Sequence, residues 1–373
     1  MIPLCKVFNS HDVEEKVGRV LKSGYVAQGP RVDEFEGELA KYFRRNEIVT
    51  TNSCTSALHL ALHILKKKLG SDISVLSSPL TCAASSCAIA GNGLRIKWCD
   101  VDRATLNIDL DSVRAKLKYD TPVLLLVHWS GYPINYRRLQ QIKDFYQAKY
   151  SRHLYVVEDC AHAWNSYFHA DQVGTHPEHF SCFSCQAVKT LNTGDGGVLV
   201  CPKSFYSDAR KLRWFGLDRD NHAGFRALQD IEHWGFKFHM NDIAATIGLA
   251  NLPHVRYNID RHRDNAAYYN KSLRGLDGVT LLRHNQRGED SSYWVYTLLL
   301  EDREEFHRYM VERGIQVSPL HVRNDKLSCF KKYEVKLPAL NSVEDRYICI
   351  PCGWWVDNKQ REHIVKSIRK FYG

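Results

Sequence analysis

Residues 153–162 read HLYVVEDCAH, a short apolar run that ends in two carboxylates and a histidine. Such a run predicts a buried strand. Similar runs recur along the first two thirds of the chain, and helical segments separate most of them. These other predicted strands are residues 73–77, 96–101, 122–128, 180–185 and 197–201. Near-continuous apolar strands that alternate with helices indicate an α/β fold with a mainly parallel sheet flanked by helices.

The chain has 373 residues, which exceeds the usual size of one compact core. Helices are predicted in the first part at residues 12–22, 32–43 and 56–69. After Leu252-Pro253 the pattern changes to a smaller α+β unit. Its predicted elements are a strand at 293–300 and helices at 261–273, 303–313 and 358–371. We therefore predict a large domain over residues 1–250 and a small C-terminal domain over residues 251–373.

The composition is that of an ordinary soluble protein, with 44% apolar and 25% charged residues. No apolar run is long enough to cross a bilayer, and the N-terminus lacks the pattern of a secretion signal, so we expect a cytoplasmic protein without a membrane partner. The net charge of +9 is spread along the chain, without a basic block interleaved with aromatic residues. This pattern disfavours nucleic acid as a partner and suits an anionic small molecule such as a nucleotide diphosphate.

Twelve cysteines are present, and free buried thiols are the expectation for a long chain of this kind. Two CxxC spacings, Cys182/Cys185 and Cys349/Cys352, could supply four thiolates to zinc. Both pairs lie in strand-like apolar runs rather than in glycine-rich knuckles. We therefore expect no metal site.

Three predicted strands run directly into polar residues, at His128, Asp159 and Ser184. Ligands of parallel sheets bind beyond the carboxyl ends of the strands, so these residues mark the expected site. Lys189 follows Ser184 after five residues, and a glycine-rich turn, 193–197, comes next. Taken singly, these residues are ordinary capping acids, surface lysines and turn glycines.

The combination has a specific chemical meaning. Enzymes that use pyridoxal 5′-phosphate need a lysine to form an imine with the cofactor and an acid to keep the pyridine nitrogen protonated. They also need hydroxyl and backbone N–H groups at a helix start to hold the phosphate. The turn at 54–56, Asp159, Ser184 and Lys189 supply these groups, in that order along the chain. The sequence therefore predicts a pyridoxal phosphate enzyme.

With these motifs the chain resembles the DegT/DnrJ/EryC1/StrS family of nucleotide-sugar aminotransferases, and within it the perosamine synthetase-like enzymes. The family has the fold-type I architecture of aspartate aminotransferase, and the resemblance runs nearly from end to end. The matching motifs are GYVAQGP at 24–30, TNSCTSAL at 51–58, VHWSG at 127–131, the Glu158-Asp159 and Lys189 motifs, GFKFHMND at 235–242 and LHVRND at 320–325.

The resemblance implies a role for each matching residue. Lys189 forms the Schiff base and moves the proton during the reaction, Asp159 pairs with the pyridine nitrogen, and His162 lies near the 3-hydroxyl of the cofactor. Four further residues would hold the phosphate: Ser184, Cys54, Thr55 and Lys237. The segment around Lys237 comes from the partner subunit in the family, which implies a homodimer with shared active sites.

The chain departs from the common family pattern at three positions. Cys54 replaces a glycine that allows close approach to the phosphate, Cys82 replaces an aromatic residue that stacks on the ring, and Lys237 replaces an asparagine. Candidates for substrate contacts, each with an alternative role as a surface or core residue, are His321, Arg323, Arg219 and Trp129.

The implied reaction moves an amino group from L-glutamate, through the pyridoxamine 5′-phosphate form, to a nucleotide diphosphate-linked keto-sugar. A 4-keto-6-deoxyhexose is the expected acceptor, and polysaccharide biosynthesis is the usual destination of such amino sugars. Amination at carbon 3 is an alternative, as are a non-catalytic binding protein and another fold-type I enzyme. Sugar dehydratases of the same fold carry histidine at the lysine position, so Lys189 argues against that activity. The nucleotide is left open.

Overall fold

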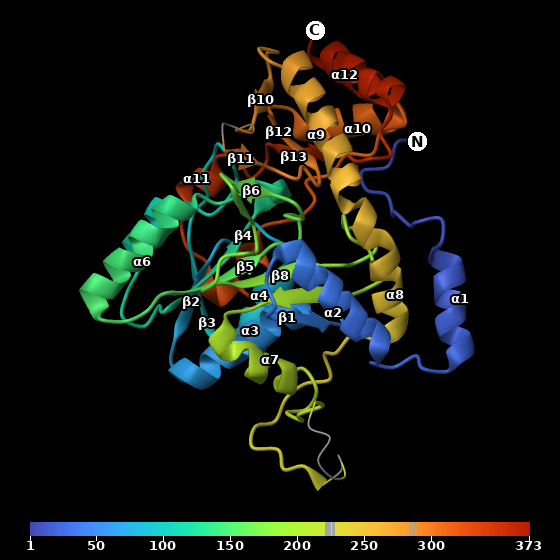
Figure 1. The fold of residues 1–373 in the computed structure, drawn as a ribbon. Coiled ribbons are helices and arrows are strands. Elements are labelled where there is room, and N and C mark those ends of the chain that lie inside the picture. Colours follow the sequence, from blue (N-terminus) through green and yellow to red (C-terminus); the bar gives the residue numbers. More distant parts are fainter. Residues whose placement is uncertain (221–224, 226–227, 284, 286–287) are drawn as a thin grey trace.

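The computed structural model describes residues 1–373 except 221–224, 226–227, 284 and 286–287. A seven-stranded sheet forms its centre (Figure 1), and the strand order is β1-β9-β8-β5-β4-β2-β3. The bounds are β1 Ile48–Thr51, β2 Ser74–Ser77, β3 Arg95–Trp98, β4 Val123–Val127, β5 Tyr155–Asp159, β8 Phe180–Ser184 and β9 Gly197–Val200. The neighbouring strands β8, β5, β4, β2 and β3 are parallel, and β9 is antiparallel to its neighbours β1 and β8. The predicted mainly parallel α/β sheet is confirmed.

Helices cover both faces of this sheet, which explains why its central strands are buried along their length. Leu125 and Val157 pack in a cluster with the apolar side of α3, whereas Leu124 and Val156 pack on the other face beside α5 and α6. The helices of this part are α1 Val13–Ser23, α2 Pro30–Phe43, α3 Cys54–Leu69, α4 Ala83–Gly91, α5 Leu110–Lys116, α6 Tyr136–Tyr150, α7 Tyr206–Leu212 and α8 Asp242–Asn251.

Most C-terminal elements gather at one end of the molecule (Figure 1) around their own apolar cluster, which includes Leu298, Phe306 and Ile364. A three-stranded antiparallel sheet, in the order β10-β12-β13, lies among helices there. The bounds are α9 Val255–Ser272, β10 Val279–Leu281, β12 Tyr296–Leu300, α10 Arg303–Glu312, α11 Pro338–Asn341, β13 Tyr347–Ile350 and α12 Asn358–Tyr372. Helix α11 instead packs on the first part of the chain, where Leu340 belongs to the apolar cluster that also contains Leu125.

Contacts of several kinds join the parts of the chain before and after residue 250. Ile2 pairs with Ile315 in a parallel bridge and belongs to the C-terminal apolar cluster. A small sheet also pairs β11 with strands of the first part; its bounds are β6 Tyr167–Phe168, β7 Asp171–Gln172 and β11 Glu289–Asp290. The division at residue 250 stays a prediction.

The elements for which the sequence predicted bounds differ from those of the structure mainly at their ends. Helix α3 starts two residues earlier than predicted, because the Ser53 side chain caps it by accepting a hydrogen bond from the Ser56 amide at 3.1 Å. The four-residue strand β1 was not predicted. Among the described residues, no helix has both the length and the apolar character that a bilayer span requires.

Candidate active site

Asp159 is the last residue of β5, and its carboxylate is held by two donors. Ser85 of α4 donates a hydrogen bond from Oγ to Oδ2 at 2.6 Å, and the Ala161 amide donates to Oδ1 at 3.0 Å. The residue is only 4% exposed. An ionised carboxylate can accept about four hydrogen bonds, so Asp159 is fixed in place and still has capacity for a cationic N–H group.

Lys189 lies in the loop between β8 and β9, where its amide donates a hydrogen bond to the Gln186 carbonyl at 2.8 Å. Its Nζ lies 3.3 Å from the centroid of the Trp294 ring. Burial lowers the pKa of the Lys189 ammonium to about 8, and the Asp159 carboxylate acts in the opposite direction. The amine can therefore gain or lose a proton close to neutral pH.

His162 and His321 present unused ring nitrogens beside this lysine. Nδ1 of His162 and Nε2 of His321 are buried and have no hydrogen-bond partner among the described residues. Burial and the charge of Lys189 lower the pKa of both imidazoles, that of His321 to about 4, so both rings are neutral. The two rings are nearly parallel, with centroids 5.8 Å apart.

These features fit pyridoxal phosphate. Buried polar atoms without a partner are rare in proteins, so Nδ1 of His162 is suited to a hydroxyl group of a bound ligand. A lysine with a lowered pKa and a fixed carboxylate complete the donor set that the cofactor requires. The sequence predicted Lys189, Asp159 and His162 as site residues, but it did not point to Ser85 or Trp294.

The predicted phosphate residues lie around the N-terminus of α3. The Cys54 thiol points toward the Cys182 carbonyl, at 3.6 Å, and is buried, so only the Cys54 backbone remains for an anion. Thr55 is exposed, and Ser184 Oγ accepts a hydrogen bond from the Gln186 amide at 3.3 Å. A Cβ atom on Gly197 would lie 2.4 Å from the Ser53 carbonyl oxygen, so a glycine is required there.

Lys237 is exposed, and its backbone lies beside the loop that precedes α3. The Asn52 side chain donates a hydrogen bond to the Lys237 carbonyl at 3.3 Å, and the Asn52 amide donates to the Phe238 carbonyl at 2.6 Å. The segment thus contacts the phosphate region of its own chain through the backbone. Its contribution to a partner subunit stays a prediction.

In three of the four candidate substrate residues, the side-chain N–H groups have partners within the protein. Trp129 is 1% exposed, donates a hydrogen bond to Thr297 at 3.2 Å, and contacts the His321 ring edge-on. Arg219 lies over the Trp214 ring at 4.3 Å and donates hydrogen bonds to Gln28.

Arg323 is 5% exposed and forms ion pairs with Asp325 and Glu344, so its contacts favour the structural role left open by the sequence. His321 is the fourth candidate, and it is the one whose unused nitrogen lies beside Lys189.

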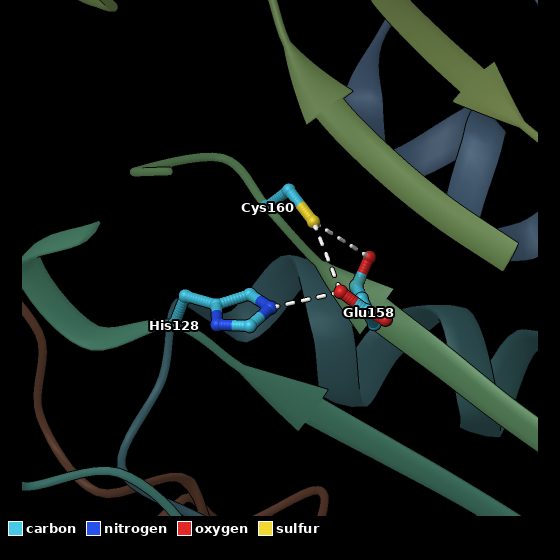
Figure 2. Close-up of side chains that lie close together, drawn as sticks. All are labelled: His128, Glu158 and Cys160. Carbon is cyan, nitrogen blue, oxygen red and sulfur yellow. Dashed lines mark hydrogen bonds and ion pairs between the residues drawn. The ribbon is translucent and has the colours of Figure 1, made fainter. Parts of the chain in front are cut away.

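Glu158, the residue before Asp159 in the chain, is the centre of a second buried cluster (Figure 2). Glu158 is fully buried and accepts hydrogen bonds from His128 Nε2 at 3.0 Å, from the Tyr136 hydroxyl at 2.6 Å, and from His179. Burial alone would raise the pKa of Glu158, but the two histidine hydrogen bonds outweigh it and hold this pKa well below its usual value.

His128, Glu158 and Cys160 have atoms close enough to hold a metal ion. Hydrogen bonding explains why these atoms lie close together, however. Nδ1 of His128 accepts a hydrogen bond from the Ile134 amide at 3.2 Å, so its Nε2 carries the proton and donates it to Glu158. Burial also raises the pKa of the Cys160 thiol well above its usual value. The cluster is a hydrogen-bonded network around one buried carboxylate.

Known proteins resemble the chain over nearly its whole length. It superposes on the crystal structure of the sugar aminotransferase CalS13 from Micromonospora echinospora with a TM-score of 0.95 and 40% identity, over 99% of this chain and 100% of that one. It is 30% identical to dTDP-4-dehydro-2,3,6-trideoxy-D-glucose 4-aminotransferase from Saccharopolyspora spinosa, over 95% of this chain and 93% of that protein. GDP-perosamine synthase from Escherichia coli O157:H7 is 28% identical, over 96% and 95%.

The sequence profile of the DegT/DnrJ/EryC1/StrS aminotransferase family matches residues 9–369. Both the family and the fold predicted from the sequence are thereby confirmed. The chain belongs to the DegT/DnrJ/EryC1/StrS aminotransferase family and is an aminotransferase that depends on pyridoxal 5′-phosphate.

Proposed function

We propose that the protein transfers the amino group of L-glutamate to the ketone of a nucleotide diphosphate-linked 4-keto-6-deoxyhexose. The observation that carries this proposal is the arrangement of Lys189, Asp159 and His162 at the carboxyl ends of adjacent strands β5 and β8. A lysine of lowered pKa, a fixed carboxylate and an unpartnered buried imidazole there match the demands of amino transfer.

Each residue has a defined task in this proposal. Bound pyridoxal phosphate supplies an aldehyde that accepts the amino group and a ring that withdraws electrons. Lys189 attaches the cofactor and, as a free amine, carries the proton at Nζ. Asp159, whose carboxylate is held by Ser85 and the Ala161 amide, would keep the pyridine nitrogen protonated through its negative charge. The unpartnered Nδ1 of His162 would hydrogen-bond the ring hydroxyl.

The choice of a nucleotide-linked sugar and of carbon 4 is supported by the relatives. Two of them bear names that contain dTDP and GDP, and the dTDP-sugar enzyme is named a 4-aminotransferase. A basic protein with a net charge of +9 suits a diphosphate substrate. We further propose that His321 contacts the sugar, because its unused Nε2 lies in the same site.

A homodimer is part of the proposal, with Lys237 of each chain contributing to the phosphate site of the other. Lys237 is exposed and therefore free to approach a second subunit. Its ammonium would neutralise part of the phosphate charge. Sedimentation of the purified protein tests the dimer, and the Lys237→Ala variant should then bind the cofactor more weakly while remaining dimeric.

The absorbance spectrum of the purified protein tests the central claim. With pyridoxal phosphate bound we expect a visible band that L-glutamate converts to the shorter-wavelength band of the pyridoxamine form. Nucleotide-linked 4-keto- and 3-keto-sugars, offered separately, should restore the first band only with the 4-keto-sugar, and mass spectrometry should detect the amino sugar. A protein that shows no band after incubation with the cofactor would contradict the proposal.

A further inference from the structure

Trp294 connects the C-terminal region to the loop that carries Lys189. It lies just before β12, is 4% exposed, and its amide donates a hydrogen bond to the Ser130 carbonyl at 3.1 Å. Its indole Nε1 donates a hydrogen bond to the Val188 carbonyl at 3.0 Å. Because Val188 directly precedes Lys189, this bond fixes the backbone from which the lysine side chain extends.

The indole ring also contacts the end of the lysine side chain. Nζ of Lys189 lies 3.3 Å from the ring centroid, and the His162 imidazole stacks on the same indole with centroids 4.2 Å apart. The negative face of an indole attracts an ammonium ion, and this attraction is strongest where water is excluded. Trp294 therefore contacts the peptide carbonyl that precedes the lysine and also Nζ at the end of its side chain, and it stacks on the residue proposed to face the cofactor hydroxyl.

A lysine side chain needs such support. It has about four rotatable bonds, and holding it in one conformation costs about 2 kcal/mol of rotamer entropy. Burial also removes water from the ammonium, which favours the neutral amine. An aromatic face offsets part of this loss without forming a permanent ion pair, so that the amine stays available for bond formation.

We propose that Trp294 is a positioning residue for Lys189: its N–H fixes the backbone before the lysine, and its ring holds the ammonium at the cofactor site. This inference rests on the proposed role of Lys189 in attaching the cofactor. Neither the sequence motifs nor the family resemblance assigned a role to Trp294.

Other charged and titratable groups also act on Lys189, and the test must take them into account. They come from β5, from the start of α3, from the N-cap of α4, from the N-terminal segment and from two loops. These groups are Asp159, Cys54, Cys82, Cys5, His162 and His321. The variants described below leave all of them in place.

The experiment follows capture of pyridoxal phosphate by cofactor-free protein, by rapid-mixing absorbance at pH values on both sides of 8. Capture requires the neutral amine, so the rate should rise with pH, with its midpoint at the pKa of Lys189. In Trp294→Leu, which removes the ring face and the N–H, the midpoint should fall by about half to one pH unit. The plateau rate should fall about tenfold, because the lysine is no longer held in place.

Trp294→Phe separates the two contacts. It keeps an aromatic face near Nζ but cannot donate to the Val188 carbonyl. We expect a midpoint close to that of the wild type and a lowered plateau rate. A midpoint in Trp294→Leu that is unchanged or raised would overturn the role of the ring. A plateau in Trp294→Phe equal to that of the wild type would overturn the role of the N–H group.

Two controls distinguish this inference from the proposed function. Borohydride reduction followed by peptide mass spectrometry should place the cofactor on Lys189 in the wild type; if it does not, the proposed function itself fails. If Lys189 is labelled but both Trp294 variants capture the cofactor like the wild type, only the inference fails. Circular dichroism shows whether each variant is folded. If Trp294→Leu is not folded, the plateau rate of Trp294→Phe tests the inference alone.

Discussion

The Ser85 hydroxyl, in the first turn of α4, donates a 2.6 Å hydrogen bond to Oδ2 of Asp159 at the end of β5. A hydrogen bond to a buried carboxylate is stronger than one between neutral groups. It selects one orientation of the carboxylate that is proposed to face the pyridine nitrogen. Residues 74 positions apart in the chain thus define one end of the active site.

Ser85→Ala should weaken the binding of pyridoxal phosphate because the Asp159 carboxylate loses one of its two fixed donors. We expect the dissociation constant to rise about tenfold, the effect of losing one hydrogen bond to a charged group. Absorbance titration of the cofactor-free protein measures it. Ser86→Ala is the matched control, since Ser86 is equally buried in α4 but accepts its hydrogen bond from Asn324. Equal effects in both variants would contradict the prediction.

Asp159→Asn should bind the cofactor more weakly and slow turnover by about a hundredfold or more, since a neutral amide cannot stabilise the pyridinium charge. Steady-state kinetics at saturating cofactor separates the loss of rate from the loss of binding. Asp144→Asn on the exposed surface of α6 should behave like the wild type. Turnover close to normal in Asp159→Asn would rule out the assigned role.

Lys189→Ala should lose turnover by at least about a thousandfold, because no other group in the site replaces the amine. Lys189→Arg is the informative partner variant: it keeps a positive charge but cannot form an imine. Borohydride reduction should fix no cofactor on either variant, and both should keep the circular dichroism of the wild type. Cofactor fixed on either variant would show that another residue attaches it.

Glu158→Gln should destabilise the fold by about 2–4 kcal/mol, because the amide cannot accept all the hydrogen bonds that His128, Tyr136 and His179 now donate. Denaturant unfolding measures the change. Glu38→Gln, which removes a surface ion pair with Lys41, should change the free energy of unfolding by less than about 1 kcal/mol.

His262 should make stability depend on pH. Burial lowers its pKa to about 4, below the value of about 6.5 in an unfolded chain. The contribution of neutral His262 to the free energy of unfolding is therefore present above about pH 6.5 and is lost as the pH falls toward 4. Between about pH 7 and about pH 5, the wild type should lose about 2 kcal/mol more unfolding free energy than His262→Gln. His307→Gln, at an exposed site, should follow the wild type.

The features that the sequence predicted correctly are those that neighbouring residues determine. Strand β5 is an apolar run, so both the strand itself and the position of Asp159 at its carboxyl end could be predicted. Ser85 and Trp294 could not, because their roles depend on contacts with residues far away in the chain: Asp159 for one, Val188 and Lys189 for the other. A serine in a helix and a tryptophan before a strand have no local signature of such contacts.

The N-terminal segment has a practical consequence for handling the protein. Ile2 pairs with Ile315 in the C-terminal region, and six residues later the Phe8 carbonyl accepts a hydrogen bond from Asn192 at 3.0 Å, three residues after Lys189. The segment therefore links the C-terminal region to the loop that carries Lys189. Removal of the first few residues would break this link at Ile2, so we expect the trimmed protein to differ from the untrimmed one in the environment of Lys189.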